Sequence, residues 1–96
     1  MKPSDQLERY RQDIRLVVKA NRAANPRVFG SVSRGEDNDD SDLDILIDPS
    51  EETSLFDLGA MQAELVDLLG VKVDIHTPNS LPGKFRDEVL AQALPI

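Results

Sequence analysis

Apolar residues recur at the spacing of a helix in three stretches of the chain. The first stretch predicts a helix over about residues 5–23, opened by a capping-box pattern at Asp5. The second predicts a helix that begins after Ser54 and ends at Gly70, and the third predicts one over about residues 82–93. The apolar positions of these helices are Leu7, Tyr10, Ile14, Val17 and Val18, then Leu55, Leu58, Met61, Leu65, Leu68 and Leu69, and finally Phe85, Val89, Leu90 and Ala93.

Three shorter segments have the composition or the alternation of β-strands. Asn25-Pro26 disfavours further helix, and the branched and aromatic residues 27–29 then predict a short strand that ends at Gly30. Residues 42–48 and 71–76 alternate, so each predicted strand has one apolar and one more polar face. The apolar faces carry Leu43, Ile45, Ile47, Val71, Val73 and Ile75, and the other faces carry Asp42, Asp44, Leu46, Asp48, Lys72, Asp74 and His76.

The predicted order is helix, strand, strand, helix, strand, helix. We therefore expect an α/β (α+β) two-layer fold, with a small mixed β-sheet of about three strands and helices packed on one face. Residues 1–96 are too few for a second independent core, so we expect one domain. Aromatic residues make up only 4% of the chain, so its core should consist mainly of Leu, Val, Ile and Ala.

The charge of the chain is unevenly distributed. The formal net charge of −7 argues against direct nucleic-acid binding, which depends on clustered Lys and Arg. Most basic residues precede or include Arg34, whereas residues 36–52 contain carboxylates and no Lys or Arg. This asymmetry suits either an anionic ligand held between a basic region and a metal-loaded acidic centre, or a basic partner protein.

Cysteine is absent, which excludes disulfides and thiolate metal sites and fits a reducing compartment. No apolar run approaches the roughly 20 residues of a membrane span, and the first ten residues lack the apolar core of a signal peptide. We expect a soluble, cytoplasmic protein that does not contact a membrane.

Three carboxylates stand out on the polar strand faces. Asp42 and Asp44 are two residues apart, about 7 Å along one strand, and Asp74 belongs to another strand. If these strands are neighbours, the three side chains converge on one surface, where like charges are costly without a divalent cation. Hard oxygen ligands favour Mg²⁺, and two such ions are the usual apparatus of an in-line phosphoryl displacement.

The segment before these carboxylates has the features of a phosphate-binding turn. Gly30 would allow a phosphate to approach the backbone, and Ser31 offers an N–H group and a hydroxyl. Arg34 could contact the same phosphates as a fixed cation. A phosphate-binding turn beside a metal-binding carboxylate set predicts a nucleotide site.

Gly30-Ser31, ten residues and then Asp42-Leu43-Asp44 resembles the GS-x10-DxD signature of the nucleotidyltransferase superfamily related to DNA polymerase β. The segment GSVSRGEDNDDSDLDILI is similar to sequences of the minimal nucleotidyltransferase branch of this superfamily. The later VDI around Asp74 resembles the segment that carries the family's third carboxylate. The ending FRDEVLAQALPI resembles the tail of MntA-type antitoxins. The resemblance thus covers nearly the whole chain.

This resemblance implies a set of roles. Asp42 and Asp44 would hold Mg²⁺ and the triphosphate of ATP, and Asp74 would complete the metal site and help to activate the attacking hydroxyl. Gly30 and Ser31 would hold the outgoing phosphates. The chain has no room for the second, substrate-binding domain of larger members, so a partner would shape the acceptor. In the MntA branch that partner is a HEPN-domain ribonuclease toxin, and AMP passes from ATP to a toxin tyrosine.

Less specific interpretations remain beside these. The acidic stretch 36–40 is more simply a solvated loop than a calcium loop, because it lacks the required glycine. A lone His76 beside a site is more often structural than a ligand, Lys72 is more simply a surface charge, and Tyr10 fits the core. For the whole chain, the alternatives are an antitoxin that only covers its partner, or transfer to a small molecule or an RNA end.

Overall fold

A computed structural model describes all residues from Met1 to Ile96. The elements follow the predicted order, with an extra helix break, a short 3₁₀ helix and a fourth strand. In chain order they are α1 (Pro3–Arg9), α2 (Arg11–Ala20), β1 (Ala23–Phe29), β2 (Leu43–Pro49), α3 (Leu55–Leu69), β3 (Val73–His76), η1 (Pro78–Ser80), α4 (Gly83–Gln92) and β4 (Leu94–Pro95).

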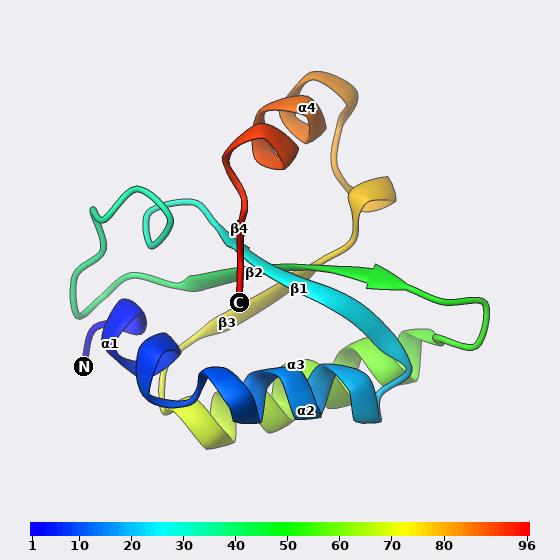
Figure 1. Cartoon of the computed structure of the whole chain (residues 1–96), viewed down its shortest axis with the longest axis horizontal. Helices are drawn as coiled ribbons and strands as arrows, with labels where there is room; N and C mark the ends of the chain where they lie inside the picture. Colours follow the sequence, from blue (N-terminus) through cyan, green and yellow to red (C-terminus); the bar gives the residue numbers. More distant parts are fainter.

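The strands form one mixed sheet in the order β3-β2-β1-β4. β1 pairs antiparallel with both β2 and β4, whereas β2 and β3 run parallel. The parallel pair is joined through α3, which crosses one face of the sheet (Figure 1). The predicted mixed α/β fold is therefore confirmed, with four strands where about three were expected.

The two faces of the sheet are covered unequally. α1, α2 and α3 lie together under one face, where most of the buried apolar side chains form the main core (Figure 1). α4 lies beyond the other face, over a second, smaller apolar cluster. That cluster consists of Phe29, Leu46, Leu81 and Val89. Three helices cover one face as expected, but α4 covers part of the other, where Leu46, assigned to the polar face, is buried instead of exposed.

The first predicted helix differs from the structure at both ends and in the middle. It begins at Pro3, a residue suited to the first helical position, and not at a capping box on Asp5. The helix is interrupted at Tyr10, which separates α1 from α2. α2 then ends at Ala20, and Arg22, two residues further on, has a left-handed φ of 65° that a continuing helix could not adopt. The apolar residues keep their helical spacing across Tyr10, so the spacing did not indicate the helix break there.

β1 is longer than the predicted segment 27–29. It begins at Ala23 and passes through Asn25-Pro26 by means of a bulge, where the register with β2 shifts. Asn25 has a φ of 53°, a conformation that asparagine tolerates better than most residues. The proline therefore interrupts the ladder locally instead of preventing the strand.

The boundaries of α3 were predicted correctly. Ser54 accepts a hydrogen bond from the backbone N–H of Asp57, whose carboxylate accepts one in return from the N–H of Ser54. Gly70 ends the helix in the left-handed conformation, with a φ of 69°. No helix of the chain has both the length and the hydropathy of a membrane span.

Candidate active site

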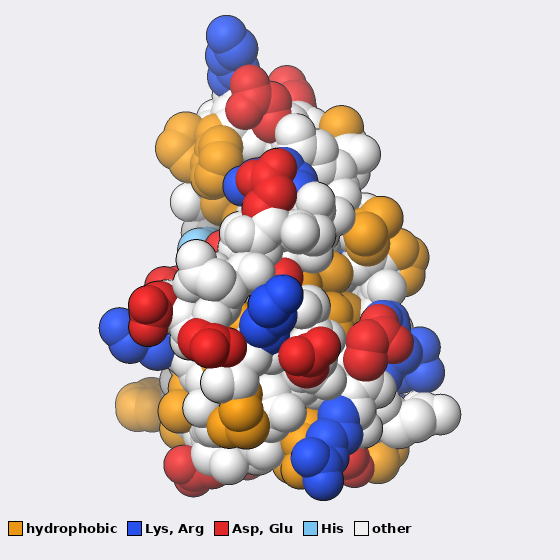
Figure 2. Space-filling model, turned by 90° about the vertical axis from the view of Figure 1, so that its left-hand side faces the viewer, with side chains coloured by type: hydrophobic (Ala, Val, Ile, Leu, Met, Phe, Trp, Pro, Cys, Tyr) orange, Lys and Arg blue, Asp and Glu red, His pale blue; other side chains and the backbone are white.

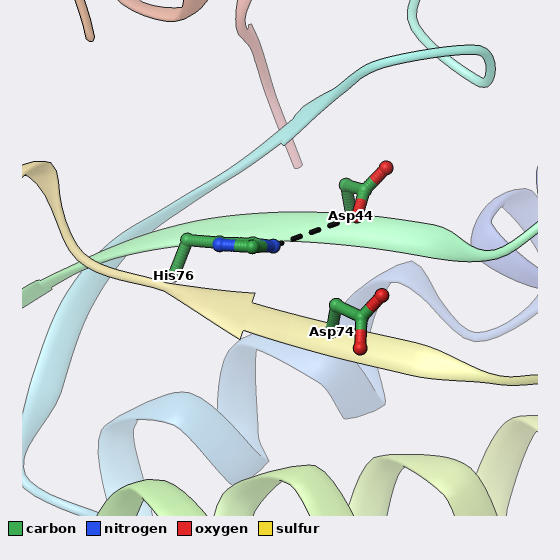
Figure 3. A group of neighbouring side chains, drawn as sticks. All are labelled: Asp44, Asp74 and His76. Atoms are coloured by element: carbon green, nitrogen blue, oxygen red, sulfur yellow. Dashed lines mark ion pairs between the residues drawn. The ribbon is translucent and has the colours of Figure 1, made fainter. Parts of the chain in front are cut away.

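The parallel pairing of β2 and β3 sets the positions of two predicted site residues. Asp44 is directly opposite Asp74 in the register of the two strands, and His76 follows two residues later on the same face of β3. Potential ligand atoms of Asp44, Asp74 and His76 all lie within 4.8 Å of one another. Figure 3 shows the three side chains projecting from the same face of the sheet, with the imidazole directed at Asp44.

Gly30 lies directly against this cluster. It follows the last residue of β1, Phe29, which pairs with Asp44. A Cβ atom on Gly30 would lie 2.7 Å from Oδ2 of Asp44, closer than non-bonded atoms approach, and the glycine has a φ of 75°. Both the close contact and the left-handed backbone exclude a side chain at this position.

Residues 30–35 form a turn with several free backbone donors. The N–H groups of Arg34, Gly35 and Glu36 donate hydrogen bonds back into the turn. In contrast, the N–H groups of residues 30–33 donate to no acceptor within the chain. The free donors next to Asp44 suit an anionic ligand such as a phosphate.

Two other predicted site residues have different surroundings. Asp42 lies just before β2, since the pairing with β3 begins at Leu43, and it is half-buried outside the group of Asp44, Asp74 and His76. Arg34 is half-exposed, and its Nε lies 3.3 Å from a carboxylate oxygen of Glu36. In this conformation Arg34 is paired with an acidic neighbour in its own loop.

His76 lies closer to Asp44 than its sequence context suggested. Its Nε2 lies 3.5 Å from Oδ1 of Asp44, is inaccessible to solvent and has no hydrogen-bond partner. The edge of its ring packs against Phe29, with 5.1 Å between ring centroids. The one signal in the sequence was its place two residues after Asp74 on an alternating strand.

Two other carboxylates near the candidate site, Asp37 and Asp48, have structural partners. Burial, the largest single effect, acts to raise the pKa of Asp37, but hydrogen bonds from Ser4 and the nearby charge of Lys2 together outweigh it, and the net pKa is lowered. Asp37 thus caps the start of α1. The expectation that residues 36–40 form only a solvated loop is therefore wrong for Asp37, which is buried. Hydrogen bonds from Arg27, opposed in part by burial, lower the pKa of Asp48, the other carboxylate on the Asp44 face of β2.

A cavity of about 340 Å³ lies just before the starts of β2 and β3 and is lined in part by Asp39 and Asp40. Lys72 lines it, but none of the residues Asp44, Asp74 and His76 does. The carboxylate cluster instead lies on an open sheet face, next to the turn at residues 30–35. Figure 2 shows one side of the molecule, where acidic and basic side chains are interspersed and form no continuous basic patch.

The donor set fits a divalent cation. Neighbouring ligands of an octahedral ion with bonds of about 2.1 Å are roughly 3 Å apart, so the separations here need only small side-chain adjustments. The side chain of Asp44 is 27% exposed, so an ion and its attached phosphates could reach the carboxylate. Paired carboxylates beside a turn of free N–H groups suit a metal-complexed phosphate, as expected for a protein of the phosphate-transferring class.

Comparison with known proteins identifies the family within this class. The family model described as "Nucleotidyltransferase domain" matches residues 11–95. The chain therefore belongs to the nucleotidyltransferase domain family, and the predicted enzyme class is confirmed.

Individual relatives agree. A "Putative protein adenylyltransferase" of Methanocaldococcus jannaschii is 39% identical over 69 residues, which is 72% of this chain and 74% of the relative. The "Protein adenylyltransferase MntA" of Thermococcus cleftensis is 40% identical over 67 residues, or 70% of this chain and 68% of the relative.

Solved structures are similar over almost the entire chain. A structure described as that of a "putative minimal nucleotidyltransferase" is 38% identical, with a TM-score of 0.88, and covers 97% of this chain and 95% of its own. A toxin-antitoxin structure with AMP-PNP has the same fold, with a TM-score of 0.71 at 18% identity, and covers 97% of this chain and 71% of its own. The chain is thus a minimal nucleotidyltransferase.

Proposed function

We propose that this protein is a cytoplasmic antitoxin that transfers AMP from ATP to a tyrosine of a cognate HEPN-domain ribonuclease toxin, and so neutralises it. The names of the two relatives support a protein acceptor. The neighbouring toxin-antitoxin structure with AMP-PNP supports both a toxin partner and an adenine nucleotide.

The observation that carries this proposal is the close approach of Gly30 to Asp44, one of the two paired carboxylates. Asp44 and Asp74 are opposite one another on parallel strands, and the glycine of the turn lies against Asp44. The turn and the carboxylates are therefore close enough to bind one metal-triphosphate group together. A solvated strand face would not require a side-chain-free residue beside Asp44.

The residues divide the work of the reaction. Asp42, Asp44 and Asp74 would hold Mg²⁺, which suits oxygen ligands and would be carried in with ATP. Gly30, Ser31 and Arg34 would contact the phosphates. When bound, two Mg²⁺ ions would neutralise the charge of the triphosphate and of the leaving group. Asp42 and Arg34 would have to turn toward the nucleotide from their present positions.

The transfer itself is a displacement at the α-phosphorus of ATP. A bond forms between the tyrosine oxygen and this phosphorus, and the bond from the phosphorus to the oxygen bridging to the β-phosphate breaks. Pyrophosphate leaves, and Asp74 helps to remove the hydroxyl proton from the tyrosine. The N–H groups of residues 30–33 would stabilise the charge on the departing phosphates.

Mass analysis of the partner tests this proposal. The cognate toxin should carry AMP on a tyrosine when it is co-expressed with this protein, and it should carry none with Asp44→Asn. The modified toxin should also lose its ribonuclease activity. If the toxin stays unmodified but is still neutralised, this protein acts by covering its partner and the enzymatic proposal is wrong.

A further inference from the structure

We propose that His76 is a further protein ligand, beside the carboxylates, of the divalent ion bound by Asp44 and Asp74, and that its imidazole shifts the preference of the site from Mg²⁺ toward Mn²⁺. This inference rests on the proposed function, because it concerns the same metal site. It adds a residue that sequence reasoning assigned to a structural role.

The geometry brings the imidazole nitrogen to the carboxylates. Nε2 of His76 lies 3.5 Å from Oδ1 of Asp44. One potential ligand atom from each of the residues Asp44, Asp74 and His76 lies within 4.8 Å of the other two. An ion bonded to Asp44 and Asp74 at about 2.1 Å would therefore lie within a small side-chain movement of this nitrogen. In Figure 3 the ring is directed along the strands toward Asp44, so it needs no large rotation.

The state of this nitrogen supports a ligand role. Nε2 is inaccessible to solvent, yet it has no hydrogen-bond partner. Buried polar atoms without a partner are uncommon and costly, so each one calls for an explanation. A bound metal ion would satisfy the nitrogen, whereas packing against Phe29 explains only where the ring lies.

Ligand chemistry then predicts the choice of ion. Mg²⁺ strongly prefers oxygen ligands and keeps several waters, whereas imidazole is a good ligand for first-row transition ions. A site of carboxylates and one imidazole should thus bind Mn²⁺ more tightly than a site of carboxylates alone. The effect on Mg²⁺ should be small, because a water can take the place of the nitrogen.

The chain contains a single histidine, which permits a direct test. After removal of any affinity-tag histidines, ¹⁴N coupling to bound Mn²⁺ in pulsed electron paramagnetic resonance can arise only from this imidazole or from a nitrogen of the nucleotide. The measurement is made at about pH 8, where an ordinary imidazole is neutral, without nucleotide and with α,β-methylene-ATP. We expect the coupling under both conditions.

His76→Phe is the matched variant, because it keeps an aromatic ring against Phe29 and removes the nitrogen. We expect it to abolish the coupling and to weaken Mn²⁺ binding on the order of tenfold, with less than about a threefold change for Mg²⁺. Asp44→Asn should weaken the binding of both ions. Thermal unfolding without metal shows whether each variant is folded.

The outcomes separate the two proposals. If wild-type protein binds Mn²⁺ in a manner that depends on Asp44 but shows no ¹⁴N coupling, this inference is wrong and the proposed function stands. If Asp44→Asn leaves Mn²⁺ binding unchanged, the proposed metal site fails, and the role of His76 fails with it.

Discussion

At the scale of single residues, the close approach of Gly30 to Asp44 links the turn to the proposed metal ligands. The glycine has a left-handed backbone, and a Cβ atom there would lie 2.7 Å from Oδ2 of Asp44. Gly35 provides a comparison, because its φ is also left-handed, at 70°, but open space surrounds the position of its missing Cβ. The two glycines therefore separate backbone strain from displacement of the carboxylate.

We predict that Gly30→Ala lowers the rate of AMP transfer at least tenfold, whereas Gly35→Ala changes it less than about threefold. Both variants should lose about 1 kcal/mol of folding stability from the strained backbone. Urea denaturation and a transfer assay measure the two effects. Equal losses of activity would mean that Gly30 acts only through its backbone conformation.

The surroundings of the candidate residues were predictable to different degrees. Spacing and strand alternation marked Gly30, Asp44 and Asp74 as candidates, and the structure places them together. The surroundings of His76, and of Asp37 outside the candidate site, were not predicted, because they depend on contacts with Asp44 and Ser4, which are distant in sequence. Spacing along one strand carries no information on such contacts.

At the scale of the elements, two helices begin at carboxylates that come from different places. Asp37, from the loop before β2, accepts a hydrogen bond of 2.9 Å from the N–H of Ser4 in the first turn of α1. Asp57 lies inside α3, bonds the N–H of Ser54 and pairs with Arg22. The second cap follows from local sequence, and the first depends on the fold.

We predict that Asp37→Ala lowers the free energy of unfolding by about 1 kcal/mol, the usual effect of losing a helix cap. Asp40→Ala is the control, because Asp40 is exposed in the same loop. Urea denaturation measures both variants. An equal effect of the two substitutions would show that loop charge, and not the cap, stabilises α1.

Asp57 should make the stability of the protein depend on pH. Hydrogen bonds from Arg22 and Ser54 lower the pKa of Asp57 from 3.8 to about 2. Since the pKa is lower in the folded state, the stabilisation is fully present above about pH 4 and is lost as the pH falls toward 2.

We therefore expect Asp57→Asn to lower the urea midpoint at pH 6 and to differ less and less from wild type as the pH approaches 2. Asp67→Asn, an exposed change on the same helix, should differ little from wild type throughout. A difference for Asp57→Asn that stays constant from pH 6 to 2 would contradict the lowered pKa.

Element boundaries were less predictable than element types. Sequence patterns identified three helical regions and the strands β1, β2 and β3, but not the break at Tyr10 between α1 and α2, the short helix η1 or the bulge at Asn25-Pro26. β4 has two residues, which is too few for any periodicity, and it exists because it pairs with β1 at Arg27 and Val28. These features depend on tertiary contacts, which override local preference.

At the scale of the whole molecule, the main core and the proposed active site lie on opposite faces of the sheet. Its lower face in Figure 1 packs on α1, α2 and α3 and contains the main core. On the opposite face, α4 covers the apolar cluster around Leu46 and Phe29, while Asp44 and Asp74 remain partly exposed. Substitutions of these two carboxylates should therefore affect transfer far more than folding.

The most direct test of the central claim is the rate of AMP transfer from ATP to the cognate toxin by wild type, Asp44→Asn and Asp48→Asn. Asp48 lies on the same strand and face as Asp44 but pairs with Arg27. The account predicts a loss on the order of a hundredfold or more for Asp44→Asn, with little change in transfer for Asp48→Asn. Undiminished transfer by a folded Asp44→Asn protein would contradict it.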